Sequence, residues 1–395
     1  MRELLRTHRK LFVFLVTANF LLQFGHRVWN ATFNNYAVER LAIGPDAVGW
    51  LQSAREVPGL LAIGIALLAM VMSELRIIAL SIVLLGAGIL LTGQASSYPL
   101  LLGATVLMSF GFHAFGPASN GALLMSVGKA EAPRVLGWMR TLAAGAGVLG
   151  TLVILLLVDR IGYPNLFMTV GAIVIVGGIV LFPLGSGGHK LPLRRRAKFR
   201  KRYWVFYVLA FLAGSRRHIL TTFAPFLLVK DFAVAVQVMS LLHLANALVN
   251  TFAHQMIGRA IARIGERWVL TIAYAVLIPV FLGYAFVPSL MILFVLFAVD
   301  NVLFSFNAGL TTYIQKIAVS PEELTGNLAA QEAIGHIAAV FIPAFGGILW
   351  GILGSQAPFL IGVGIAVVSL VFAQLVKTTP AEGEGVSEGE AAAGV

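Results

Sequence analysis

The stretch YWVFYVLAFLAGSRRHILTTFAPFLLV, residues 203–229, is long enough to cross a bilayer, yet it carries Arg216, Arg217 and His218 at its middle. A transmembrane helix needs about 20 mostly apolar residues. Each arginine near its centre costs roughly 2.5 to 3.5 kcal/mol on insertion. The stretch therefore predicts a membrane-spanning helix whose charged middle faces water, other protein groups or a ligand.

The composition indicates a membrane protein with many spans. Of the 395 residues, 59% are hydrophobic and 11% are charged, with a mean hydropathy of +0.90, whereas soluble domains carry about 25% charged residues. The net charge of +11 does not indicate nucleic-acid binding, because the basic residues concentrate in short loops between apolar segments. The chain has no cysteine, which excludes disulfides, thiolate metal sites and cysteine nucleophiles.

Apolar segments of spanning length recur along the chain and are too continuously apolar for barrel strands. They lie at about 11–36, 46–72, 76–93, 98–127, 134–157, 163–183, 203–229, 234–257, 267–286, 288–315, 325–351 and 356–376. We therefore expect an all-α membrane protein with twelve transmembrane helices in two pseudo-symmetric six-helix bundles. The expected parts are an N-terminal bundle (1–184), a basic cytoplasmic linker (185–202), a C-terminal bundle (203–377) and a disordered acidic cytoplasmic tail (378–395).

The distribution of lysine and arginine predicts the orientation. Of the 28 such residues, 21 fall on the side of the termini, 3 lie in the opposite loops and 4 lie inside helices. Basic loops are retained on the cytoplasmic side. Both ends of the chain are therefore expected in the cytoplasm, in a multi-pass protein of the plasma (cytoplasmic or inner) membrane whose linker meets membrane lipids.

The two halves repeat each other. At an offset of 191 positions, His26 aligns with Arg217 and Arg27 aligns with His218, and three helices align without a gap. Polar residues in one half thus align with polar residues in the other half. Positions that face lipid would not show this correspondence. The repeat indicates a duplicated chain with a basic site between its halves.

The loop GRAIARIGER, residues 258–267, carries a local signature. It resembles the glycine-and-arginine loop of the major facilitator superfamily, although Ala262 stands where that family has an aspartate. The two six-helix halves and the basic linker extend the resemblance over essentially the whole chain. It implies a secondary transporter whose gating residues are Gly258, Arg259, Arg263, Gly265 and Arg267, with Arg76 in the first-half copy.

The resemblance also implies alternating access around a cavity lined mainly by helices 1, 4, 7 and 10. The unusual polar residues fall on those helices. The family's drug–proton antiporters carry an arginine in helix 4 and a Gly-Pro motif in helix 5, whereas this chain has His113 in helix 4 and no proline in helix 5. Efflux of amphipathic drugs is therefore an alternative, as is a membrane scaffold or sensor that transports nothing.

Four arginines inside the spans favour a small organic anion as substrate, because arginine binds carboxylate or phosphate through paired hydrogen bonds. Adjacent Arg216 and Arg217 point about 100° apart on a helix. Only one can face the cavity squarely, and the other is expected to pair with Asp300 or another acid. The expected substrate-binding residues are Arg27, Arg216, Arg217, His243, Asn246, Asn30 and Asn301.

Coupling to protons requires groups that change charge within the membrane. The candidates are Asp300, Glu56, His113 and His218. A permanent ion pair with the helix at 203–229 is the structural alternative for Asp300, and hydrogen-bonded packing is the alternative for His113. Arg55 and Glu56 are expected on different faces of their helix, and His254 and His336, nearer helix ends, are expected to be structural.

The sequence predicts neither an enzyme nor a cofactor nor a metal site. It contains no HxxxH pair, no phosphate-binding glycine loop with Lys-Ser/Thr, and no Ser/His/Asp arrangement. Intramembrane arginines would also repel a dication. The expected partners are the anionic small molecule, protons and membrane lipids, without nucleic acid, and the chain is expected to act as a monomer.

Overall fold

The computed structural model describes residues 9–61, 71–126, 132–185 and 200–377. Most of the predicted basic linker and the whole predicted acidic tail lie outside the described residues. Within the described ranges the regular structure is entirely helical, which confirms the predicted all-α fold. The main helices are α2 (Arg9–Leu41), α3 (Pro45–Leu60), α5 (Glu74–Gln94), α6 (Tyr98–Ser126), α7 (Ala132–Leu184), α8 (Trp204–Lys230), α9 (Val236–Phe286), α10 (Leu290–Ser305), α11 (Ala308–Ile317), α12 (Pro321–Leu353) and α13 (Gln356–Ala373).

Two of these helices are helix pairs joined without a loop. The helix α7 has 53 residues and breaks at Gly162 (φ 73°, ψ 166°), and α9 has 51 residues and breaks at Gly265 (φ 77°, ψ 166°). Only glycine adopts such a backbone readily. Each pair corresponds to two of the predicted spans.

Eight helices of the described chain are long and apolar enough to cross a membrane, counting α7, α9 and the α10–α11 segment once each. The helix α3 has only 16 residues, and α8 carries Arg216, Arg217 and Lys230. The predicted span at 288–315 is not one continuous helix, because it is interrupted between Ser305 and Ala308.

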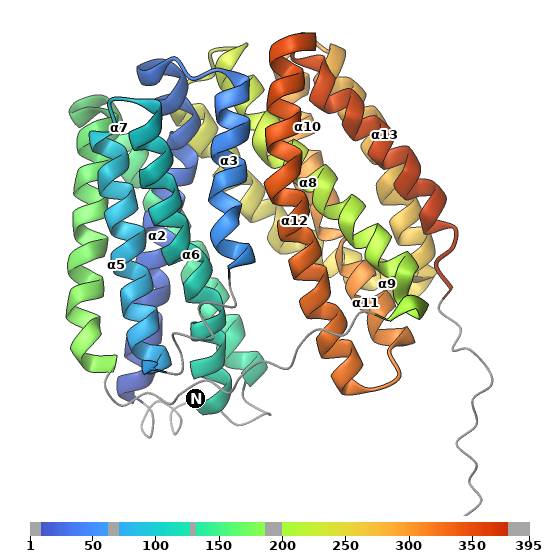
Figure 1. The fold of residues 1–395 in the computed structure, drawn as a ribbon, viewed down its shortest axis with the longest axis horizontal. Coiled ribbons are helices and arrows are strands. Elements are labelled where there is room, and N and C mark those ends of the chain that lie inside the picture. The colour runs from blue at the N-terminus through green and yellow to red at the C-terminus, as the bar shows by residue number, and fades with distance from the viewer. Residues whose placement is uncertain (1–8, 62–70, 127–131, 186–199, 378–395) are drawn as a thin grey trace, which may run out of the picture.

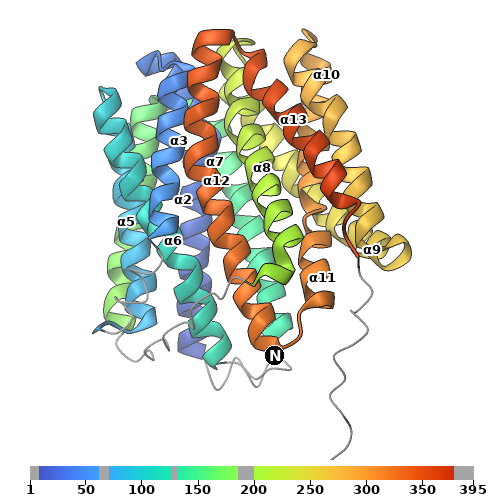
Figure 2. The same cartoon turned by 45° about the vertical axis from the view of Figure 1, so that its right-hand side comes forward.

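The helices form two groups in space. In Figure 1 the N-side helices (α2, α3, α5, α6 and α7) lie on one side, and the C-side helices (α8 to α13) lie on the other. The predicted boundaries of the two bundles stay a prediction. We call the end where α2 begins and α13 ends the terminal end, and the end where α2 stops at Leu41 the far end. Figure 2 shows α11 at the terminal end.

The two groups meet most extensively where α3 packs against α12. Two glycines permit this approach near the far end. A Cβ atom on Gly49 would lie 3.0 Å from the Cα of Gly347, and a Cβ on Gly347 would lie 3.0 Å from the Cα of Gly49. The amide of Ala344 also donates a hydrogen bond to Ser53 Oγ at 2.9 Å. Small residues thus bring the two backbones together, as is typical of helix packing in membranes.

Two further hydrogen-bonded contacts join the groups at the far end. Asn35 Nδ2 of α2 donates to the backbone oxygen of Val234 at 2.8 Å. Gln237 Nε2 of α9 donates to both carboxylate oxygens of Asp159, each at 2.8 Å. These contacts, the bond from Ala344 to Ser53 and the contact of His336 with Glu56 lie between the far end and the level of Glu56.

Candidate functional site

A cluster of ionisable side chains lies between the two groups of helices. Glu56 of α3 is 8% exposed and accepts a hydrogen bond from its neighbour Arg55, with Nη2 3.0 Å from Oε1. His336 Nδ1 of α12 lies 3.3 Å from Glu56 Oε2, and His113 Nε2 of α6 lies 3.7 Å from the same oxygen. We name these four residues the Glu56 cluster. One carboxylate thereby connects three helices from both groups.

Two sequence-based expectations bear on this cluster. Adjacent positions point to different faces of a helix, but the long side chain of Arg55 folds back onto its neighbour Glu56. His336, expected to be structural, lies beside Glu56 on α12 and 5.1 Å, ring to ring, from His113. A glycine makes room for its ring, since a Cβ on Gly59 would lie 2.6 Å from His336 Nδ1. The only sequence signal for His336 is a histidine within a span.

The neighbouring arginines of α8 have different environments. Arg216 is 2% exposed, donates to Asn307 Oδ1 at 2.6 Å and lies over the Tyr274 ring. Its guanidinium therefore sits at the interruption between α10 and α11, where it also complements the negative end of the α10 dipole. Arg217 is exposed, and its guanidinium lies 4.4 Å from the centre of the Phe304 ring. Of the two, Arg217 is the exposed one.

Other groups of α8 share the face of Arg217. Thr221, four residues later, is also exposed, and His218 is partly buried. Arg217 and His218 lie within electrostatic range of Glu56, across the boundary between the helix groups. The Glu56 cluster and this face of α8 therefore belong to one polar region.

A second basic region lies on α2. Arg27 is partly buried beside two glycines of α7, because a Cβ on Gly147 would lie 3.3 Å from its Nε and one on Gly150 would lie 3.1 Å from its Cγ. His243 of α9 lies within electrostatic range of the Arg27 guanidinium. The neighbouring His26 stacks on Phe112 at 4.3 Å, within electrostatic range of the Glu56 cluster. Arg27 thus extends the basic region toward the C-side helices.

The remaining predicted substrate residues have different settings. Asn30 is partly exposed on α2. Asn246 is 4% exposed and donates to the backbone oxygen of Phe297 at 3.3 Å, so it joins α9 to α10. Asn301 donates to Asp300 Oδ1 at 3.1 Å. The structure therefore places Asn246 in helix packing and Asn301 in a network around Asp300.

Asp300 does not form the expected ion pair with α8. Its Oδ2 accepts a hydrogen bond from the Tyr284 hydroxyl at 2.9 Å, and its Oδ1 accepts one from Asn301. The helix α10 turns this carboxylate toward α9 rather than toward α8. Arg216 lies beside Asn307 instead, and Arg217 lies over the ring of Phe304.

The predicted gating residues contact their own group of helices. Arg267 donates to Gln374 Oε1 at 3.0 and 3.3 Å, and Arg76 lies over the Phe182 ring at 5.8 Å. These two arginines are equivalent in the sequence repeat, and each contacts the last helix of its own half. Within the same loop Gly258, Arg259 and Arg263 are exposed, and Gly265 supplies the break in α9.

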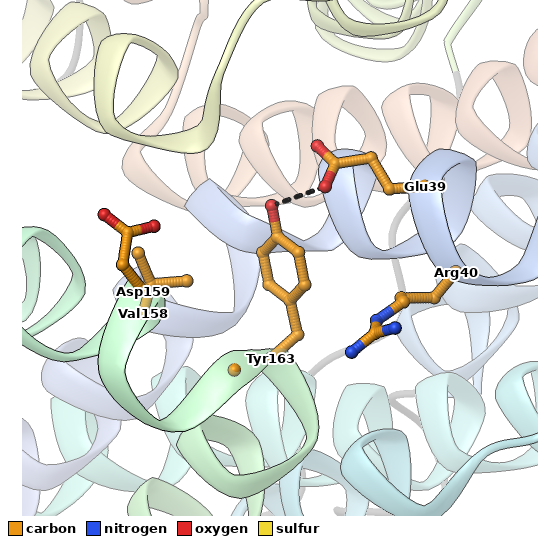
Figure 3. Close-up of a pocket in the computed structure, with 6 residues that line it drawn as sticks. Glu39, Arg40, Val158, Asp159 and Tyr163 are labelled. Atoms are coloured by element: carbon orange, nitrogen blue, oxygen red, sulfur yellow. Dashed lines mark hydrogen bonds between the residues drawn. The ribbon is translucent and has the colours of Figure 1, made fainter.

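A pocket of about 340 Å³ opens at the far end, away from the Glu56 cluster (Figure 3). In it the Tyr163 hydroxyl donates to Glu39 Oε2 at 3.1 Å. Asp159, on its wall, also accepts the hydrogen bonds from Gln237. The lining residues are Glu39, Arg40, Val158, Asp159, Gly162 and Tyr163. The pocket therefore borders the far-end contact between the helix groups.

Comparison with solved structures identifies the fold. A bacterial homologue of the human lysosomal transporter Spinster, in an inward-facing and occupied conformation, matches with a TM-score of 0.75 at 16% identity, covering 93% of this chain and 96% of that one. A mutant of the nucleoside transporter NupG matches with a TM-score of 0.75 at 18% identity, covering 93% and 100%. The unoccupied inward-facing Spinster homologue gives 0.71 at 15%, covering 92% and 94%.

The family is shown by a sequence model as well. A search of curated proteins gives no match. The model of the Major Facilitator Superfamily matches residues 15–318 and 205–394. The twelve-helix fold predicted from the sequence is confirmed by the agreement between this match and the solved structures. The chain therefore belongs to the Major Facilitator Superfamily and is a multi-pass membrane protein of secondary transport, not an enzyme.

Proposed function

We propose that the chain moves a small organic anion by alternating access, with Arg217 as the principal group that binds the anion. The observation that carries this proposal is the exposure of Arg217 at the middle of α8, in a chain whose neighbouring Arg216 is buried. The described residues form no salt bridge with Arg217 at 4.0 Å or less. Its guanidinium donors are therefore available for a carboxylate or phosphate.

The charge around Arg217 supports an anion over a cation. Arg55 compensates the negative charge of Glu56 at 3.0 Å. Arg217 and Arg27 add two positive charges to the same central region, and two histidines, His113 and His336, contact the carboxylate. An anion entering this region meets groups that attract it, whereas a cation meets a net positive field. Arg27, with Asn30 and His243 near it, is the second group proposed to contact the substrate.

The contacts between the helix groups support access from the terminal end in this conformation. Asn35, Gln237 and Ser53 hold the groups together toward the far end. In a rocking mechanism, a substrate would then enter and leave between the terminal ends of the helices. We propose that this end faces the cytoplasm, because the basic residues of the sequence concentrate there.

The Glu56 cluster is the proposed place of proton coupling. Its carboxylate contacts histidines from both helix groups, so protonation of either partner changes an interaction that holds the groups together. Histidine changes charge near neutral pH in its ordinary state. Binding of a proton here is thereby linked to the movement of α12 relative to α3.

A ligand panel on the purified protein tests the proposal. Mono- and dicarboxylates, a sugar phosphate, a sulfonate, lipophilic cations and divalent metals are each compared by thermal shift. A ligand at 100 times its dissociation constant stabilises the folded state by about 2.7 kcal/mol. We expect one anion class to raise Tm, and uptake of that anion into proteoliposomes to follow.

Two variants distinguish binding at the proposed site from a nonspecific effect of removing one positive charge. Arg217→Gln should abolish the thermal shift, and Arg27→Gln should weaken it. Arg202→Gln is the matched control, because Arg202 is an exposed arginine just before α8. Stabilisation by lipophilic cations alone would instead support drug efflux, and an anion response that survives in Arg217→Gln would refute the proposed site.

A further inference from the structure

The pocket at the far end has charged groups of both signs in its wall. Glu39 and Arg40 lie in the last turn of α2, and Asp159 and Tyr163 lie on either side of the break of α7 at Gly162. All three charged side chains are within electrostatic range of the Tyr163 hydroxyl. The volume of about 340 Å³ falls in the range of roughly 300–1,000 Å³ that small-molecule sites have. The charges of two helices thus converge on one pocket outside the central region.

The two carboxylates of the pocket have neutral partners. Among the described residues, neither Glu39 nor Asp159 forms a salt bridge at 4.0 Å or less. Asn35 and Tyr163 donate hydrogen bonds to Glu39, and Gln237 donates to Asp159. An ionised carboxylate accepts about four hydrogen bonds. Both groups therefore have lone pairs left for a positively charged donor.

The positive group of the pocket lies apart from Asp159. In Figure 3 the hydroxyl of Tyr163 points to Glu39, and Asp159 and Arg40 lie on opposite sides of the tyrosine ring. Arg40 also forms no salt bridge within the part of the chain that the structure describes. Carboxylates bind an ammonium group, and a guanidinium binds a carboxylate through paired hydrogen bonds. A molecule with both groups therefore matches the pocket better than a molecule with only one of them.

Both carboxylates are also connected to the contact between the helix groups. Asn35 Nδ2 donates to Glu39 Oε1 at 2.9 Å and to the backbone oxygen of Val234 at 2.8 Å. Gln237 Nε2 lies 2.8 Å from each carboxylate oxygen of Asp159. The residues that line the pocket belong to α2 and α7 of the N-side group, whereas Val234 and Gln237 belong to the C-side group. A ligand in the pocket therefore shares its acceptors with the groups that close the far end.

We propose that the far-end pocket binds a small zwitterion, a molecule with one ammonium group and one carboxylate group. Glu39 and Asp159 bind the ammonium group, and Arg40 binds the carboxylate. The ammonium group competes with Gln237 for the oxygens of Asp159, so the bound molecule favours the conformation in which the far end is open. The pocket is separate from Arg217, and binding in it does not depend on the proposed transport of an anion.

Isothermal titration calorimetry on the full-length purified protein tests the site with glycine, β-alanine and 4-aminobutanoate. Butylamine and butanoate each lack one of the two charged groups and are the matched controls at equal ionic strength. We expect at least one zwitterion to bind with a Kd about tenfold or more below that of either control, because each control loses a charge-assisted interaction. The absence of binding by all three zwitterions, or equally tight binding of butylamine, would overturn the proposal.

Variants at exposed positions locate the binding. Asp159→Asn and Arg40→Gln should each raise the Kd of the zwitterion by about tenfold or more. Arg160→Gln, at an exposed arginine outside the pocket lining, and Asp231→Asn, at an exposed aspartate after α8, should leave it unchanged. Gln237→Ala should lower the Kd, because it removes the competing donor. An unchanged Kd in Asp159→Asn or Arg40→Gln would refute the site, and an unchanged or higher Kd in Gln237→Ala would refute the competition.

The two proposals fail separately. Arg217→Gln should lose the response to organic anions, including any binding of butanoate at the central site, and should keep the binding of the zwitterion. A chain that binds a zwitterion but responds to no anion would refute the proposed anion substrate alone. A chain that responds to an anion but binds no zwitterion would refute the far-end site alone.

Discussion

Glu56 of α3 and His336 of α12 lie 3.3 Å apart, with the imidazole Nδ1 facing the carboxylate Oε2. The two residues are separated by 280 positions in the sequence and belong to different helix groups. His113 and Arg55 complete the coordination of the same carboxylate. One connection between the groups at the level of Glu56 is thus ionisable, and its strength depends on protonation.

Glu56→Gln tests this connection. The substitution preserves shape but removes the charge that faces Arg55 and two histidines, leaving buried donors without their charged acceptor. Loss of such a partner costs about 1–3 kcal/mol. We expect a lower free energy of unfolding and a transport rate that no longer varies with pH. Glu332→Gln, at an exposed glutamate of α12, is the control, and an unchanged pH profile in Glu56→Gln would exclude the cluster from coupling.

Asn307→Ala separates the structural arginine from the ligand-binding one. Asn307 Oδ1 is the hydrogen-bond acceptor of the buried Arg216 at 2.6 Å. Removing it leaves a buried guanidinium unsatisfied, at a cost of about 1–3 kcal/mol. We expect lower stability, measured by thermal or denaturant unfolding, with unchanged affinity for the anion. A large loss of anion affinity at unchanged stability would place Arg216 in the substrate site.

Gly347→Ala tests the contact of α3 with α12 near the far end. The new methyl group would lie 3.0 Å from the Cα of Gly49, so the two helices must move apart. Such overpacking costs about 1–3 kcal/mol. We expect the equilibrium to shift toward a conformation open at the far end, seen as a longer distance between spin labels there. Gly351→Ala on the same helix has open space around its new methyl and should not change the distance.

The sequence was sufficient to predict the helical fold because hydropathy and the length of each span determine which segments cross the bilayer. It also predicted the equivalence of Arg76 and Arg267, each of which contacts the last helix of its half. Both results depend on local composition and on the repeat. Neither requires knowledge of how the helices rotate about their axes.

The pairing of charged residues depends on that rotation and was predicted less well. The 100° separation between adjacent positions showed that Arg216 and Arg217 face different surroundings. Which of the two is buried depends on the interruption of α10 at Phe306 and Asn307. Asp300 turned toward Tyr284 rather than toward α8. His336 gave no sequence pattern, because its partner lies on another helix in the other half.

The most direct test of the account is the rate at which cysteines at two adjacent positions of α8 react with a water-soluble thiol reagent. The native chain has no cysteine, Thr221 is exposed on the face of Arg217, and Thr222 is 3% exposed. We predict rapid labelling of Thr221→Cys, little labelling of Thr222→Cys, and protection of Thr221→Cys by the stabilising anion only while Arg217 is present. Equal labelling of both positions, or protection that persists in Arg217→Gln, would contradict an anion site on this face of α8.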